Sequence, residues 1–312
     1  MIPFKLLPTY KNYIWGGNKL RPDSPRTAEA WIVFDENIIM DGEFAGFSLN
    51  QLINSNGVSL LGSKVVAKTG KTFPLLIKLL DCEQWLSLQV HPNNEQAQQL
   101  AGFNHYGKTE AWYIINAEEN AQIISGFRPN VTSEEINNCI GRKDILDLVK
   151  TINVQANDTV FISPGTIHAL GPGLLLYEVQ QNSDITYRVY DWDRPMKGNR
   201  KLHLEESIQV INPKNKGLII ADDPMIPYLP KKELITCEYF TLSLLHGHQN
   251  KLDIASDGTS FSVITALSHQ IEINGTDWSF KLSPYETLFL PAKCKRFSVI
   301  FHHEAKALYT YC

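Results

Sequence analysis

The stretch Leu75–Pro92, LLIKLLDCEQWLSLQVHP, contains two short apolar runs separated by a polar turn, and it decides the fold class. Both runs are shorter than an ordinary helix, so they predict strands with little exposure to water. Similar runs recur along the chain between Gly, Pro, Asn and Asp residues. With these two, the predicted strands lie at 73–80, 86–91, 111–116, 159–162, 174–180, 186–190, 261–266 and 286–290. Many short strands between turns indicate a mainly β protein built as a sandwich or barrel.

A few segments carry helical signals instead. Asn93 follows Pro92 and is a suitable N-cap, and Thr132 and Glu135 have the spacing of a capping box. The predicted helices cover 93–101, 132–141, 142–151 and, with a weaker pattern, 204–211. The first three would form a small helical insertion around 93–151 in an otherwise β domain.

Composition limits the kinds of partner. The chain has 312 residues, 43% hydrophobic and 20% charged, with a net charge of −4, so it can bury a real core and lacks the basic excess of nucleic-acid binders. No run reaches the roughly 20 apolar residues that span a bilayer, and the N-terminus lacks a signal-peptide pattern. The five cysteines form no CxxC pair. We expect a cytoplasmic monomer or weak homodimer without membrane or nucleic-acid partners.

Three separated places hold residue types that bind metals. Gln89 and His91 lie two apart at the end of a strand, so their side chains point to the same face. Glu110 precedes another strand, and His168 ends a tight turn. Two imidazoles, a carboxylate and an amide oxygen without thiolates suit a catalytic zinc with an open coordination position. Whether Gln89 is a direct ligand stays open at this stage.

The turn Pro164–His168, PGTIH, resembles the PxGxxH pattern of the second metal motif in the cupin fold, with Gly165 three residues before His168 but directly after the proline. Gln89, His91 and Glu110 fit the first half of that fold. We therefore predict two cupin-like β-sandwich (jelly-roll) domains. The proline-rich stretch 213–233 is the expected linker between a metal-binding catalytic domain, 1–212, and a C-terminal cupin-like domain without ligands, 234–312.

Several motifs together resemble a known family. Leu75–Pro92 resembles the signature of type I mannose-6-phosphate isomerases. Tyr13–Gly17 (YIWGG), Gly107–Ile114 (GKTEAWYI) and Pro164–Arg194 resemble the short bacterial branch of that family. The resemblance runs from about residue 5 to residue 210, with the motifs in the family order.

The resemblance implies an enzyme that interconverts mannose 6-phosphate and fructose 6-phosphate. It implies one Zn²⁺ per chain, held by Gln89, His91, Glu110 and His168. It also implies an essential arginine at Arg188, a pocket glutamate at Glu178, and lysines near the sugar at Lys78 and Lys108.

The chemistry of such an isomerase suits these residue types. A proton moves between C1 and C2 through an enediol, whose negative charge a zinc ion and a guanidinium can stabilise. Lys78, Glu178 and zinc-bound water remain competing bases, and Lys108 suits a phosphate or a hydroxyl. Arg188 could instead form a structural salt bridge with Asp184 or Asp191.

Two other functions remain compatible with the sequence. A cupin with a His/Glu site can be a metal-dependent oxygenase, using iron or manganese. A cupin can also be a sugar-binding module without catalytic activity. The presence of Arg188 and Glu178 with every expected ligand favours the isomerase.

Overall fold

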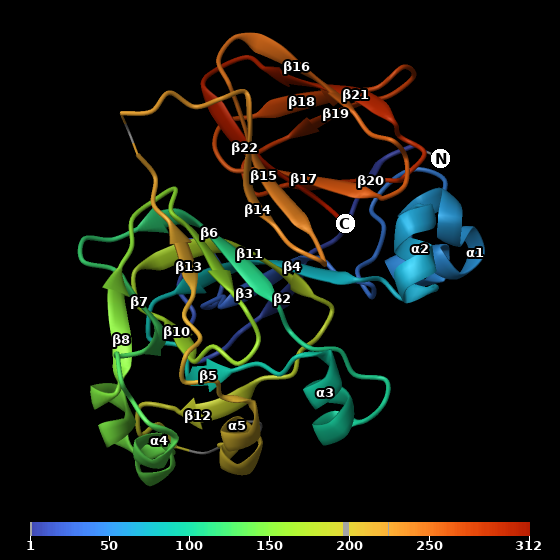
Figure 1. Ribbon diagram of the computed structural model, residues 1–312. Coiled ribbons are helices and arrows are strands. Elements are labelled where there is room, and N and C mark those ends of the chain that lie inside the picture. The colour runs from blue at the N-terminus through green and yellow to red at the C-terminus, as the bar shows by residue number, and fades with distance from the viewer. Residues whose placement is uncertain (1, 196–199, 224) are drawn as a thin grey trace. The chain divides into compact units, whose positions relative to one another are not determined.

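The computed structural model describes residues 2–195, 200–223 and 225–312 (Figure 1). It is mainly β, with antiparallel strands in several sheets, as the sequence predicts. By packing, the chain divides into two compact units: one is Met1–Thr9, Trp31–Ile77 and Asp223–Cys312, and the other is Tyr10–Ala30 and Lys78–Asp222. This division falls inside the predicted linker at 222/223, but it also groups two early segments with the C-terminal strands.

The unit Tyr10–Ala30 plus Lys78–Asp222 is built on two sheets. One has the order β12 (Tyr187–Tyr190), β5 (Leu88–Val90), β10 (His168–Leu170), β7 (Gln122–Phe127) and β8 (Val149–Asn153). The other has the order β13 (Leu218–Ile220), β9 (Thr159–Ile162), β6 (Glu110–Ala117), β11 (Leu174–Gln181), β4 (Leu75–Cys82), β3 (Glu29–Val33) and β2 (Thr9–Lys11). The chain passes between the units within β2, β3 and β4 and again after Asp222. Leu80, Trp112 and Ile123 share one buried cluster, so side chains of both sheets form a common core.

Helices of this unit begin where the capping residues predict. α3 (Asn94–Ala101) has a complete capping box on Asn93, and α4 (Ser133–Cys139) has one on Thr132. α5 (Leu204–Val210) also forms, and Figure 1 shows α4 and α5 beside the five-stranded sheet. The predicted helix 142–151 is only partly correct, because the segment forms a short 3₁₀ helix, η1 (Lys143–Asp147), and then enters β8. Pairing with β7 supplies the backbone partners that a longer helix would have supplied.

The other unit contains most of the remaining strands. A six-stranded sheet has the order β1 (Phe4–Lys5), β20 (Thr287–Leu290), β17 (Ser262–Ala266), β22 (Ala305–Tyr311), β15 (Thr241–Gly247) and β14 (Lys231–Thr236). A four-stranded sheet has the order β16 (Asn250–Ala255), β21 (Arg296–Phe301), β18 (Ile271–Asn274) and β19 (Ser279–Leu282). Apolar side chains from both sheets fill one core. The strand-rich character predicted after residue 234 is confirmed.

Two helices of this unit were not predicted, α1 (Leu49–Leu61) and α2 (Ser63–Thr69). α1 begins at Ser48, whose side chain forms a capping box with Gln51. That spacing was available in the sequence as a start signal. Asn, Ser and Gly residues within α1 weaken its intrinsic helix propensity, so burial of its apolar face must supply the stability.

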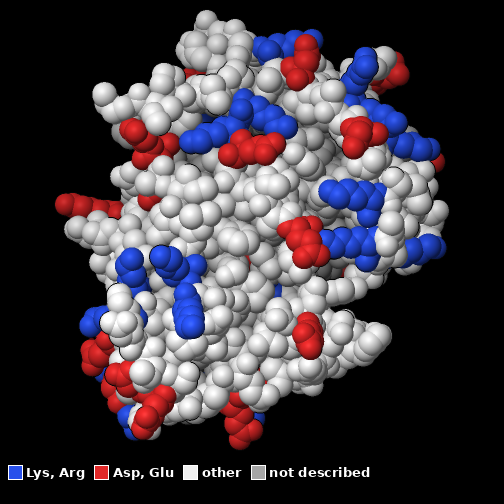
Figure 2. Space-filling model, in the orientation of Figure 1, with Lys and Arg blue, Asp and Glu red and all other residues white. Residues whose placement is uncertain are grey.

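No helix among the described residues is both long and apolar enough to cross a bilayer. Figure 2 shows lysine and arginine side chains in small groups among aspartates and glutamates on the face that it draws. Such a mixed surface agrees with the modest net charge of −4. No disulfide bond joins any two cysteines of the described chain.

Candidate metal centre

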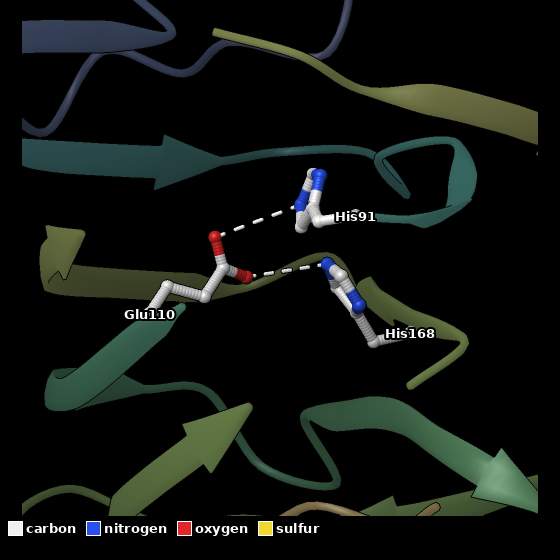
Figure 3. A group of neighbouring side chains, drawn as sticks. All are labelled: His91, Glu110 and His168. Atoms are coloured by element: carbon white, nitrogen blue, oxygen red, sulfur yellow. Dashed lines mark ion pairs between the residues drawn. The ribbon is translucent and has the colours of Figure 1, made fainter. Parts of the chain in front are cut away.

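Three buried side chains converge between the two sheets of the unit that contains β5, β6 and β10. His91 follows β5, Glu110 begins β6, and His168 begins β10. Glu110 Oε1 lies 3.2 Å from His168 Nε2, and Glu110 Oε2 lies 3.6 Å from His91 Nε2. Figure 3 shows the carboxylate pointing between the two imidazoles. Their ligand atoms all lie within 4.8 Å of one another, close enough to share one ion.

Backbone carbonyls fix the orientation of both imidazoles. His91 Nδ1 lies 2.9 Å from the Ile185 carbonyl oxygen, and His168 Nδ1 lies 2.9 Å from that of Thr166. A carbonyl only accepts, so each Nδ1 carries the proton and each Nε2 presents a lone pair. Both lone pairs face the Glu110 carboxylate, whose Oε1 accepts no hydrogen bond. Two lone pairs and a carboxylate oxygen form a donor set that fits a divalent transition metal.

Gln89 completes the ring of possible ligands. Its side-chain amide nitrogen lies 3.3 Å from His168 Nε2 and 3.5 Å from His91 Nε2, while its oxygen accepts from Ser87 Oγ at 3.2 Å. Amide nitrogen and oxygen are assigned from hydrogen bonding, and a half-turn about the terminal bond exchanges them. With that exchange, the oxygen of Gln89 faces the ligand atoms of both histidines.

Strand register places Arg188 beside these ligands. Gln89 of β5 lies opposite His168 of β10 on one side and opposite Arg188 of β12 on the other. Directly opposed residues in neighbouring strands project to the same face of a sheet. Arg188 therefore projects to the same face as Gln89 and His168.

Lys108 lies against the ligand atoms themselves. Its ammonium nitrogen is 2.5 Å from Glu110 Oε2 and 3.2 Å from His91 Nε2. Burial works against ionisation of Glu110, but the Lys108 ammonium outweighs it and holds the pKa of the carboxyl well below its usual value. Burial, followed by repulsion from Lys108, also holds the pKa of His91 well below its usual value. Both groups are thus in the ionisation state that metal binding requires.

A second buried ion pair adjoins the first. Lys78 of β4 donates to Glu178 Oε1 of β11 at 3.0 Å, and its nitrogen lies 3.8 Å from Glu29. Trp112 donates its indole N–H to the other oxygen of Glu178 at 3.1 Å. Burial alone would lower the pKa of Lys78, but Glu178 and Glu29 together raise it above its usual value. Lys78 is therefore an ammonium at neutral pH.

The surroundings of Arg188 are mainly cationic. One of its guanidinium nitrogens donates to the Lys201 carbonyl oxygen at 3.0 Å. Burial and then repulsion from Arg200 lower the pKa of Arg188. Asp191, one of the two expected salt-bridge partners, is bound by Arg194 at 2.7 Å and Arg200 at 2.5 Å.

Glu29 is one residue near this centre that the sequence analysis did not single out. A glutamate inside the apolar run Ala28–Phe34 (AEAWIVF) was the available signal, because such a residue needs a buried partner. Two C-terminal histidines pair elsewhere: His246 faces Glu304, and His302 faces Glu272. Within the described ranges, only His91, Glu110 and His168 bring three His, Cys, Asp or Glu ligand atoms together.

Comparison with known proteins points to one family. The family model "Phosphomannose isomerase type I, catalytic domain" matches residues 3–130. Mannose-6-phosphate isomerase ManA of Bacillus subtilis is 38% identical over 252 residues, which cover 77% of this chain and 78% of that protein. Mannose-6-phosphate isomerase of Streptococcus mutans is 40% identical over 210 residues, or 64% of either chain.

A solved structure extends the similarity to the complete chain. The crystal structure of mannose 6-phosphate isomerase from Bacillus subtilis superposes with a TM-score of 0.82 at 28% identity, covering 100% of both chains. Similarity of both sequence and fold along so much of the chain identifies the family. The chain belongs to the type I phosphomannose isomerases.

Proposed function

We propose that this protein is a zinc-dependent mannose-6-phosphate isomerase that forms fructose 6-phosphate through an enediol. The convergence of His91, Glu110 and His168, with both Nε2 lone pairs facing one carboxylate, carries the proposal. Family membership supports the choice of reaction. Gln89, His91, Glu110 and His168 would hold the zinc ion, one per chain.

A divalent ion bound there would polarise sugar oxygens as a Lewis acid and lower the pKa of a bound water. The protein's own groups supply the remaining chemistry. Arg188 lies in the row of Gln89 and His168 and presents a fixed fork of donors. Its permanent charge can stabilise an enediolate oxygen or hold a phosphate.

The protonation state of Lys78 decides between the candidates for the catalytic base. A base must accept the C2 proton of the open-chain aldose and return it to C1. Lys78 is already protonated, since Glu178 and Glu29 raise its pKa, so it serves as a hydrogen-bond donor to a substrate oxygen. We therefore assign the proton transfer to the Glu178 carboxylate, with metal-bound water as the competing base.

Lys108 takes a substrate-binding role in this proposal. Its ammonium now contacts Glu110 and His91, two of the proposed ligands. Like-charged groups cannot share those atoms, so a metal ion there favours turning the flexible lysine stem away. The freed ammonium then suits a hydroxyl or the phosphate of the sugar.

A coupled assay for fructose 6-phosphate made from mannose 6-phosphate tests the proposal directly. Turnover should disappear with a chelator and return with zinc. Arg188→Lys keeps a positive charge but loses the fork, and it should lower kcat about 100-fold or more. Oxygen consumption that depends on iron or manganese, with no sugar-phosphate turnover, would instead identify a cupin oxygenase. Sugar-phosphate binding without turnover under any metal would identify a binding module.

A further inference from the structure

The segment 107–109 connects two parts of the metal centre, because it carries Lys108 and leads directly into Glu110. All three of its backbone N–H groups have partners from outside the segment. Gly107 donates to Asn94 Oδ1 at 2.8 Å, Lys108 to the Pro92 carbonyl oxygen at 3.0 Å, and Thr109 to Gln181 Oε1 at 3.0 Å. The segment is thus fixed between the start of α3 and the end of β11.

Two side-chain amides connect these partners to each other. Gln181 donates its side-chain N–H to Asn94 Oδ1 at 3.0 Å. The Asn94 oxygen therefore accepts hydrogen bonds from both Gln181 and Gly107. The Gln181 backbone N–H also donates to the Thr109 carbonyl oxygen at 3.1 Å. Gln181 is 5% exposed and Thr109 is 4% exposed, so water competes little for these bonds.

Gly107 lets the segment approach α3 this closely. A Cβ atom at that position would lie 2.4 Å from the Asn93 carbonyl carbon and 2.6 Å from the Asn94 nitrogen. These are backbone atoms, which cannot move aside as a flexible side chain can. The short distance keeps the Asn94 side chain within reach of the segment.

We propose that Gln181 and Asn94 form an amide clamp that positions Glu110 and Lys108 for the metal and the substrate. Asn94 accepts from the Gly107 backbone N–H and Gln181 from that of Thr109, so both amides act through the backbone of 107–109. The inference rests on the proposed metal function. Partners that orient metal ligands typically contribute 10- to 100-fold to metal affinity or activity.

The geometry of the clamp distinguishes four variants. Asn94→Asp keeps an acceptor oxygen for both donors and adds a favourable negative charge in the first turn of α3. Asn94→Leu and Gln181→Met remove the clamp at similar side-chain size. Gln181→Glu keeps the acceptor for Thr109 but loses the donor to Asn94. Gln99→Met is the matched control, because Gln99 is an exposed amide on the same helix that bonds only to Glu95 among the described contacts.

The experiment measures zinc affinity by chelator competition and amide hydrogen exchange at residues 107–109, in addition to kcat and KM. We expect Gln181→Met and Asn94→Leu to bind zinc about 10- to 100-fold more weakly and to exchange these amides faster. Asn94→Asp and Gln99→Met should match the wild type, and Gln181→Glu should lie between. The double variant Gln181→Met/Asn94→Leu should be little worse than either single variant, because both remove one clamp.

A purely structural role predicts a different pattern. Gln181→Met and Gln181→Glu would then lower the melting temperature while zinc affinity and kcat of the folded protein stay at the wild-type values, and the proposal would be wrong. Failure of Asn94→Asp to restore zinc affinity would also overturn it. Zinc affinity and amide exchange are measured without substrate. Absence of isomerase activity in the wild type would therefore count against the proposed function and leave the clamp test intact.

Discussion

At the residue scale, Lys78 shows how a buried charge depends on its neighbours. Its side chain is 8% exposed, and Glu178 lies 3.0 Å away with Glu29 at 3.8 Å. Burying a charge at such a depth lowers stability unless the charge is paired. If one partner is removed by mutation, the other becomes an unpaired buried charge and lowers stability in the same way. The pair therefore links stability to the chemistry of the centre.

Lys78→Met should lower the free energy of unfolding by about 3–5 kcal/mol, because Glu178 would keep a buried charge without its closest cation. Urea unfolding measures the loss. Lys19→Met provides the control, since Lys19 and Glu118 form an ion pair of 2.7 Å at the surface. That pair should contribute at most about 1 kcal/mol. Equal losses in the two variants would contradict the role assigned to burial.

The same ion pair predicts how the contribution of Lys78 to stability depends on pH. The pKa of Lys78 is higher in the folded protein than the unfolded value of about 10.4, so its stabilising effect is complete below that pH. The effect is lost only as pH rises through the folded pKa. Proton binding at Lys78 should thus contribute no pH dependence to the unfolding free energy of the wild type between pH 6 and about 9, which urea unfolding at several pH values measures.

At the scale of elements, one row across three strands assembles much of the centre. β10, β5 and β12 place His168, Gln89 and Arg188 opposite one another. A slip of one residue in any pairing would turn the corresponding side chain to the other face of the sheet. Correct register is therefore a requirement for the site, and the buried apolar residues between these positions enforce it.

The segment before β6 gives a sharp prediction. Gly107→Ala should reduce zinc affinity and kcat at least as much as loss of the clamp, about 10-fold or more, because the added Cβ would meet the backbone of Asn93 at 2.4 Å. Chelator competition and the coupled assay measure the two effects. Gly57→Ala is the control, because a Cβ there meets nothing within 4 Å. Wild-type zinc affinity in Gly107→Ala would show that the segment can shift without cost.

The cap of α1 should affect stability alone. Ser48→Ala removes the side chain that accepts from the Gln51 backbone N–H and should lower the free energy of unfolding by about 1 kcal/mol. Because α1 carries none of the proposed site residues, kcat and KM should stay at their wild-type values. A changed kcat would mean that α1 influences the centre.

At the scale of the whole molecule, metal binding should stabilise the fold. The four proposed ligand residues come from three separated parts of the chain, so the site exists only when the chain is folded. Zinc at 100 times its Kd should add about 2.7 kcal/mol to the free energy of unfolding. Differential scanning calorimetry with added zinc measures this effect. His168→Ala should lose most of it, and an equal gain in that variant would place the ion elsewhere.

The sequence predicted the fold class because short apolar runs between turn residues occur locally, and these runs became strands. It also named His91, Glu110 and His168, because each stands at the edge of a strand in a recognisable motif. Asn93 and Thr132 predicted the starts of α3 and α4 through their own side chains. Helix α1 was missed because Asn, Ser and Gly residues obscure its apolar pattern, and α2 was missed because its 7 residues are too few to show one.

The amino-acid sequence by itself determined which strands form and which residue types are available for metal and sugar chemistry. Only the tertiary structure decided that Arg188 stands in the row of Gln89 and His168, that Glu29 joins Lys78, and that Gln181 and Asn94 hold the segment before Glu110. The physical reason is that propensities and caps act between near neighbours along the chain. Strand register and side-chain partners are set by packing between segments that are far apart along the chain, as Phe4 and Phe289 are in β1 and β20.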